Sequence, residues 1–187
     1  MILPITGFGH PVLRAETQEI SQDYADLDTL IENMFETMYN ANGVGLAAPQ
    51  IGLPLRLFIV DGSPMDGEDG EDMADFKRVF INPVIEAETG EEWGFEEGCL
   101  SIPDLREDVF RQETIRISYQ DLGFQQVSET LSGLKARIVQ HEYDHIEGIL
   151  FTDHLSPLRR RVIKPRLHKI QKGLIRTPYP MKYSRKK

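Results

Sequence analysis

The sequence has 187 residues, of which 40% are hydrophobic and 27% are charged. This balance is typical of a folded globular protein and excludes collagen-like, coiled-coil and wholly disordered chains. No apolar run approaches the roughly 20 residues that cross a bilayer, and the N-terminal stretch lacks the basic and apolar regions of a secretory signal. We therefore expect a cytoplasmic protein without membrane contact, whose single cysteine, Cys99, forms no internal disulfide.

Charge is distributed unevenly along the chain, although its net value is −9. All 30 acidic residues lie within residues 1–158, whereas residues 159–187 carry 12 of the 21 Lys and Arg residues and no acid. A basic segment on an anionic chain favours contact with an anionic partner such as RNA, but the same pattern is found in solvated tails. We expect a main domain over 1–158, followed by a basic helix and a loose tail over 159–187.

The first two thirds of the chain combine one helical pattern with several strand patterns. Apolar residues recur at helical spacing over 21–40, so we expect an amphipathic N-terminal helix. Residues 61–76 hold seven acids and three glycines and predict a surface excursion that does not touch the functional motifs. Runs rich in β-branched and aromatic residues predict strands over 55–60, 79–82, 114–119 and 125–131.

Two further helices are expected near the C-terminus. The first lies between Ser132, a residue suited to the N-cap, and Gly148, which ends the pattern. The second begins at Ser156-Pro157, is kinked or interrupted at Pro165, and leaves residues 177–187 as a loose end. Strands in the middle of the chain and helices towards both ends indicate an α+β fold. In the helix expected between Ser132 and Gly148, one face carries Leu134, Ile138, His141 and His145.

The segment QHEYDHIEG places His141 and His145 one helical turn apart, with Glu142 between them. Two imidazoles at this spacing reach a single metal ion, and the intervening carboxylate serves as a general base in the H-E-x-x-H arrangement of metal-dependent hydrolases. The alternative is a surface helix with two ordinary histidines. Because both histidines share a face with apolar residues, we favour the metal site.

A catalytic metal needs a third protein ligand and an open position for water. Position 151, six residues after His145, is Phe151 rather than the histidine of a metzincin, and no acid follows Asp153 to act as in a thermolysin-like peptidase. His154 is one candidate. We favour Cys99, in the segment EEGCLSIP at the expected end of a strand, because a thiolate binds a divalent cation strongly. The alternative role for a free cysteine is that of a small buried hydrophobe.

The segment GVGLAAPQIG at residues 43–52, taken alone, predicts a tight turn before the 55–60 strand. Together, GVGLAAPQ, EGCLS and QHEYDH resemble the three signature motifs of the peptide deformylase family, and the resemblance extends to LFTDHLSPL at 150–158. It implies an α+β fold in which antiparallel strands enclose the metal-binding helix of a metallohydrolase domain over 1–158. It also implies removal of the formyl group from the N-formylmethionine of newly synthesised proteins.

The resemblance further implies roles for individual residues. The family typically uses one Fe²⁺ ion per chain, with Zn²⁺ or Ni²⁺ as substitutes, and Glu142 would be the catalytic acid/base. Gln50 and the backbone N–H of Leu100 would bind the carbonyl oxygen, while Gly45 would line the substrate groove. The metal ligands would be Cys99, His141 and His145. An apolar wall for the methionine side chain is expected from Val44, Leu134 and Ile138.

The chain departs from the family pattern at Arg137, one turn before His141, where an apolar residue often flanks the methionine pocket. We expect the charged head of Arg137 to border the opening of that pocket and to bias substrate choice. Two other functions compete with deformylation. One is a general H-E-x-x-H metallopeptidase, and the other is a non-catalytic ribosome-associated module that contacts ribosomal RNA through its basic tail.

Overall fold

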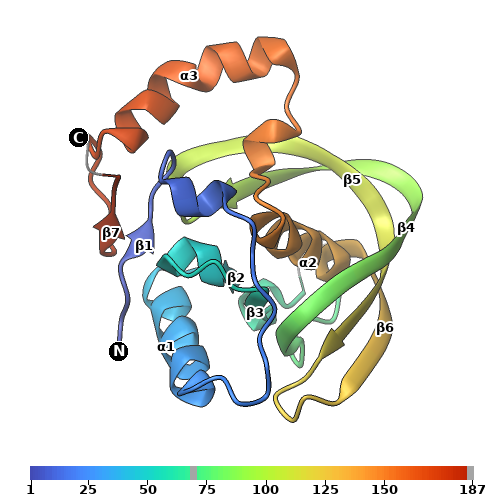
Figure 1. Cartoon of the computed structure of the whole chain (residues 1–187). Helices are drawn as coiled ribbons and strands as arrows, with labels where there is room; N and C mark the ends of the chain where they lie inside the picture. Colours follow the sequence, from blue (N-terminus) through green and yellow to red (C-terminus); the bar gives the residue numbers. More distant parts are fainter. Residues whose placement is uncertain (68–70, 185–187) are drawn as a thin grey trace.

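The computed structural model describes residues 1–67 and 71–184 of the chain. A five-stranded antiparallel sheet runs in the order β2-β3-β4-β5-β6 and curls around helix α2, which spans Gly133–Ile146 (Figure 1). The α+β fold with an antiparallel sheet is therefore confirmed. The strands span Gly45–Ala47, Leu57–Asp61, Lys77–Cys99, Ile102–Gln120 and Gln126–Ser132.

Strands β4 and β5 arch around α2 and are much longer than the sequence predicts (Figure 1). The prediction is wrong because residues 86–92 of β4 are exposed, so no alternation of apolar and polar residues marks them as a strand. Register shifts between Ile81 and Val84 and between Thr89 and Glu92 further disrupt the two-residue period. The chain reverses after β4 at Leu100–Ser101 and continues directly into β5.

Helix α2 lies in the centre of the main hydrophobic core, where burial of its apolar face stabilises the fold. Ser132 occupies the predicted N-cap position but makes no capping bond, because its hydroxyl pairs with Thr114. The carboxylate of Glu71 instead accepts the hydrogen bond of the Leu134 N–H at 2.8 Å. The core residues packed around α2 include Phe58, Phe80, Ile115 and Ile117.

The acidic segment 61–76 contributes to the core, contrary to the expectation of a surface excursion. Met73 and Phe76 are buried in the cluster that contains α2, and Glu71 binds the first turn of that helix. These contacts tie the segment to the helix that carries both histidines, and the Asp61 N–H binds the carbonyl of Val44 in GVGLAAPQ at 2.9 Å, so the segment does touch a functional motif. Residues 68–70 within the segment lie outside the described part of the chain.

Helix α1 spans Leu27–Asn40 and begins later than the predicted residue 21. Asp26 has a positive φ of 58°, which a helix cannot continue through, so the preceding residues form turns instead. The helix buries one face against β2 and β3. Its buried apolar residues are Leu27, Ile31, Met34 and Met38.

Helix α3 spans Pro157–Gln171 and continues through Pro165, so the predicted interruption is wrong. Pro165 is exposed, and the carbonyl it leaves unbonded in the preceding turn can be satisfied by water. Ile163 and Ile170 attach the helix to the body, whereas Leu158 is 72% exposed. No helix within the described residues is long and apolar enough to cross a membrane.

The two ends of the chain pair with each other, so residues 177–184 are not the loose end that the sequence predicts. Strand β7, Met181–Lys182, lies parallel to β1, Ile5–Thr6, and both termini lie on the same side of the molecule (Figure 1). The pairing could not be predicted from local patterns, because each strand has only two residues and the paired residues, Ile5 with Met181 and Thr6 with Lys182, lie 176 positions apart in the sequence.

Candidate active site

The end of β4 and helix α2, which lie far apart in the sequence, meet at one point. Cys99 lies at the end of β4, while His141 and His145 project from successive turns of α2. Their ligand atoms lie within 4.8 Å of one another, and Cys99 Sγ is 3.2 Å from Nε2 of His145. One sulfur and two imidazole nitrogens directed at a common point match the donor set of a tetrahedral metal site with one open position.

Glu97 fixes the orientation of His141. Its Oε2 lies 2.9 Å from Nδ1 of the imidazole, which leaves the opposite ring nitrogen to face Cys99. Arg111 binds both carboxylate oxygens, at 2.7 and 3.0 Å, and Arg137 binds Oε1 at 3.1 Å. Burial opposes ionisation of Glu97, but the hydrogen bonds from His141 and Arg111 outweigh it and hold the pKa well below its usual range.

Cys99 is poised as a thiolate. Burial alone would raise the pKa of the thiol, but the neighbouring His145 and His141 lower it to about 5. A deprotonated sulfur at neutral pH is the form that binds a divalent cation. The donor set and the electrostatics of the described residues therefore fit a bound metal ion.

Glu142 is 5% exposed and lies between the two histidines on α2. Burial raises the pKa of its carboxyl to about 7, in the range suited to proton transfer at neutral pH. Its Oε2 has no hydrogen-bond partner among the described residues. Gly45 is required beside it, because a Cβ atom at that position would lie 2.4 Å from Oε1 of Glu142.

Gln50 and Leu100 border the same point from the other side. Gln50 is buried in the short 3₁₀ helix Ala48–Ile51, where its Oε1 accepts the Ala47 N–H at 2.8 Å. This bond directs the amide nitrogen of Gln50 towards Cys99 Sγ, at 3.5 Å, and Ser101 Oγ, at 3.3 Å. The backbone N–H of Leu100 has no acceptor among the hydrogen bonds of the described chain.

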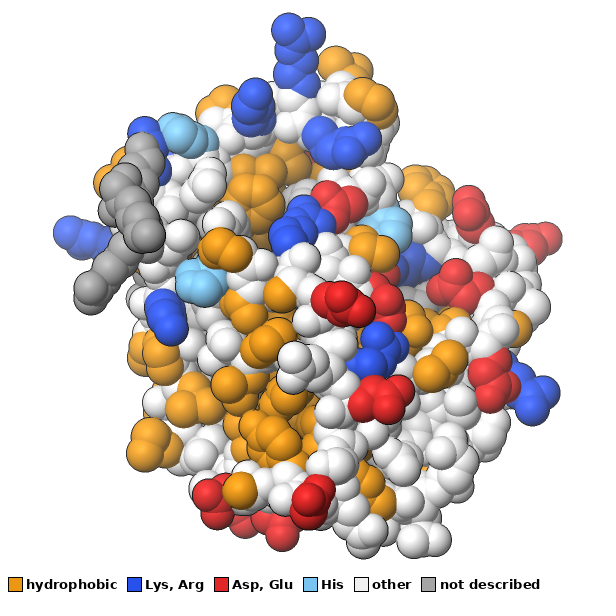
Figure 2. All heavy atoms as spheres, viewed as in Figure 1, with side chains coloured by type: hydrophobic (Ala, Val, Ile, Leu, Met, Phe, Trp, Pro, Cys, Tyr) orange, Lys and Arg blue, Asp and Glu red, His pale blue; other side chains and the backbone are white. Residues whose placement is uncertain are grey.

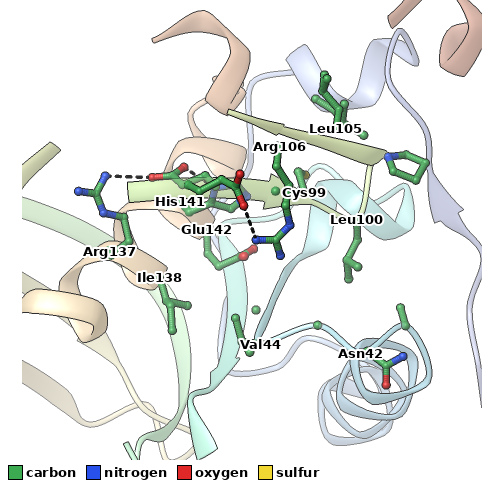
Figure 3. Close-up of a pocket in the computed structure, with 18 of the residues that line it drawn as sticks. Asn42, Val44, Cys99, Leu100, Leu105, Arg106, Arg137, Ile138, His141 and Glu142 are labelled. Atoms are coloured by element: carbon green, nitrogen blue, oxygen red, sulfur yellow. Dashed lines mark hydrogen bonds and ion pairs between the residues drawn. The ribbon is translucent and has the colours of Figure 1, made fainter. Parts of the chain in front are cut away.

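A cleft of about 690 Å³ opens onto this cluster. The predicted apolar residues Val44, Leu134 and Ile138 all line it, as do Gly45 and Glu142. Figure 3 shows the side chains of Val44 and Ile138 on the same side of the cleft, below Glu142. The structure thus brings together every residue that the sequence analysis selected for the site.

Comparison with known proteins agrees with this geometry. A family model described as polypeptide deformylase matches residues 2–161. The chain belongs to the peptide deformylase family. Peptide deformylases are metal-dependent hydrolases that remove the formyl group from the N-terminal formylmethionine of nascent peptides, and this is the activity of the chain.

Curated deformylases and solved deformylase structures resemble the chain over nearly its whole length. The peptide deformylase of Christiangramia forsetii is 56% identical over 189 residues, covering 98% of this chain and 96% of that one. The peptide deformylase of Flavobacterium psychrophilum is 53% identical over 193 residues and covers 100% of both chains. The crystal structure of the Legionella pneumophila deformylase has a TM-score of 0.80 and 39% identity, over 95% of this chain and 100% of that one. The crystal structure of the Thermus thermophilus deformylase has a TM-score of 0.82 and 39% identity, over 92% of this chain and 99% of that one.

His154 and Arg137, which the sequence analysis considered beside the site residues, have other partners in the structure. His154, weighed as a metal ligand, pairs with Asp144 at 2.7 Å and is outside the group of ligand atoms. Arg137 lines the cleft, but contrary to expectation it places no exposed charge at the pocket opening, because its side chain is 3% exposed and its guanidinium binds Glu97 (Figure 3). It also stacks on Trp93, with the guanidinium carbon 4.4 Å from the ring centre.

Sequence reasoning missed three residues around the deformylase site. Glu97 precedes Cys99 by two positions on a strand, so their side chains point to the same face, and this spacing could have revealed it. Arg111 and Tyr179 reach the site from β5 and from the C-terminal segment. No local pattern marks either residue, because only the tertiary fold brings them close.

Proposed function

We propose that Cys99, His141 and His145 hold one Fe²⁺ ion, for which Zn²⁺ or Ni²⁺ can substitute in preparations. Support comes from the thiolate character of Cys99 and from Glu97, which occupies Nδ1 of His141. A bound divalent cation would lower the pKa of water toward neutrality and polarise the formyl carbonyl.

Glu142 acts as the general acid/base in this proposal. Its carboxyl takes a proton from the attacking water and returns one to the leaving amine, for which the raised pKa of about 7 suits it. Gln50 and the Leu100 N–H donate hydrogen bonds to the formyl oxygen as negative charge develops there. Both donors are available, because the contacts of the Gln50 amide nitrogen are long and the Leu100 N–H has no acceptor within the described residues.

The cleft explains selectivity for a formylated methionine. Val44, Leu134 and Ile138 offer an apolar wall for the unbranched methionine side chain. Gly45 lets the substrate backbone approach Glu142, where a larger residue would collide. A formyl carbon carries only hydrogen beside its oxygen and nitrogen, so a narrow site admits it and excludes bulkier acyl groups.

The observation that carries the proposal is the convergence of the Cys99, His141 and His145 ligand atoms beside the buried Glu142. Formylated and acetylated versions of one Met peptide test it. We expect rapid hydrolysis of the formyl peptide and little or none of the acetyl peptide, measured as release of the free amine. Comparable hydrolysis of both, or cleavage at an internal bond, would instead indicate a general metallopeptidase.

Metal analysis tests the proposed ligands. Anaerobically purified wild-type protein should contain iron near one atom per chain, whereas Cys99→Ala should lose it because the thiolate supplies one of the three protein ligands. His154→Ala is the matched control and should keep its metal, since His154 binds Asp144 instead. Loss of metal from the His154 variant, or its retention in the Cys99 variant, contradicts the assignment.

We further propose that residues 1–158 carry the chemistry and that the basic segment from 159 docks the enzyme on ribosomal RNA in the cytoplasm. Lys and Arg side chains gather over α3 in Figure 2. Arg159 is bound to Glu107 and Arg166 to Asp104. The other Lys and Arg residues of α3 are exposed, form no ion pair with described residues and remain for phosphate contacts: Arg160, Arg161, Lys164 and Lys169.

Changing Arg160, Arg161 and Lys164 together to Gln should weaken ribosome co-sedimentation at low salt. Co-sedimentation of the wild type should itself weaken steeply as the salt concentration rises. Hydrolysis of a free formyl-Met peptide should be unchanged, because α3 does not line the cleft. The control converts Arg78, Arg116 and Lys135, which lie outside α3, to Gln with the same change in charge. Equal co-sedimentation of both variants and the wild type would rule out docking through α3.

A further inference from the structure

The C-terminal segment returns from α3 to the catalytic cleft. Residues 177–184 lie outside residues 2–161, the part of the chain matched by the family model. The segment is anchored by its pairing with β1, in which the N–H of Ile5 binds the Pro180 carbonyl at 2.9 Å and that of Gly7 binds the Lys182 carbonyl at 2.8 Å. Backbone pairing with β1 therefore holds this segment in place at the edge of the cleft.

Tyr179 is the residue of this segment that reaches the cleft. Its side chain lines the cavity, and its hydroxyl donates a hydrogen bond to the Leu100 carbonyl at 3.0 Å. The adjoining Tyr183 differs, because its hydroxyl binds Met181 Sδ at 3.1 Å and it does not line the cleft. The two tyrosines thus share one segment but have different contacts.

The turn that Tyr179 contacts carries two functional groups. Cys99 immediately precedes Leu100, so a tilt of this turn would move the sulfur and the Leu100 N–H together. The pairing of Cys99 with Ile102 closes the turn, and two hydrogen bonds hold it from outside: the Phe8 N–H binds the Ser101 carbonyl at 2.9 Å, and the Gln50 amide binds Ser101 Oγ at 3.3 Å. Both of those hydrogen bonds reach Ser101, whereas among the described residues the hydrogen bond to Leu100 comes from Tyr179.

We propose that Tyr179 is a positioning residue for deformylation, which holds the Leu100 turn so that its N–H faces the formyl oxygen. The inference rests on the proposed role of the Leu100 N–H. A donor to a developing oxyanion is effective only when its direction is fixed before the reaction. The C-terminal segment is accordingly part of the catalytic apparatus, and the hydroxyl of Tyr179 is the group through which it acts.

Tyr179→Phe tests the inference in the full-length, metal-loaded enzyme, with Tyr183→Phe as the matched control. Removal of the Tyr179 hydroxyl should lower kcat for a formyl-Met peptide by about three- to tenfold, the range expected for one hydrogen bond. KM should change little because the ring remains in the cleft. Amide hydrogen exchange at Phe8, whose N–H binds the Ser101 carbonyl of this turn, should accelerate, whereas Tyr183→Phe should match the wild type in kcat and exchange.

The outcomes separate this inference from the proposed function. A wild-type enzyme that fails to deformylate would overturn the proposed function itself. If the wild type is active and Tyr179→Phe has the same kcat, Tyr179 has no positioning role, even where exchange at the turn is faster. If kcat and the melting temperature fall to the same extent in Tyr179→Phe and in Tyr183→Phe, the effect is a general loss of stability, and the inference is overturned as well.

Discussion

Glu142→Gln is expected to lower kcat for a formyl-Met peptide by about 10²- to 10⁴-fold while the fold and the bound metal are retained. The amide has the same shape as the carboxylate and fits against Gly45, but it cannot accept and return a proton. Steady-state assays, metal analysis and thermal unfolding of the same preparation measure the three quantities. Glu142→Ala should lose activity to a similar extent.

Glu147→Gln is the matched control for this prediction. Glu147 directly follows α2 and carries the same charge, but its partner is Arg56 and it does not line the cleft. Its turnover should equal that of the wild type. If Glu142→Gln keeps more than about a tenth of the wild-type kcat, Glu142 is not the general acid/base.

Arg137→Leu is expected to lower the free energy of unfolding by about 3–5 kcal/mol, because removal of one member of a buried charge network leaves its partners uncompensated. The side chain of Arg137 is 3% exposed, and it also binds the carbonyls of Trp93 and Val109. Urea unfolding of wild type and variant, both metal-free, measures the difference without a contribution from metal binding.

Arg116→Leu provides the comparison for Arg137. Arg116 forms an ion pair with Glu86, but its side chain is 63% exposed, so the change should cost at most about 1 kcal/mol. Similar costs at both positions would show that Glu97 is held adequately by Arg111 alone. In that case Arg137 would contribute packing against Trp93 rather than charge compensation.

The parts of the site that could be predicted are those encoded by local spacing. His141, Glu142 and His145 follow from the period of a helix, and Cys99 follows from the need for a third ligand. The resemblance to the deformylase motifs then directed attention to Gln50, which the structure places beside Cys99. The antiparallel sheet was expected on the same ground.

The features that escaped prediction depend on contacts between distant segments. The exposed stretch of β4 is a strand because β5 pairs with it, although its own residues show no strand period. Met73 is buried because the core accepts it, within a segment whose acidic composition indicates a surface loop. Arg137 is buried by Glu97 and Trp93, which lie 40 or more positions away in the sequence.

The pairing of β1 with β7 has a consequence for how the enzyme is made. Its two strands lie at opposite ends of the chain, so the pair can form only after synthesis has reached Lys182. The core around α2 can assemble earlier, since all of its strands precede that helix or adjoin it. Each new molecule therefore gains the contact between Tyr179 and the Leu100 turn after the core around α2, so an enzyme that acts on unfinished proteins lacks this contact until the segment beyond α3 has itself been made.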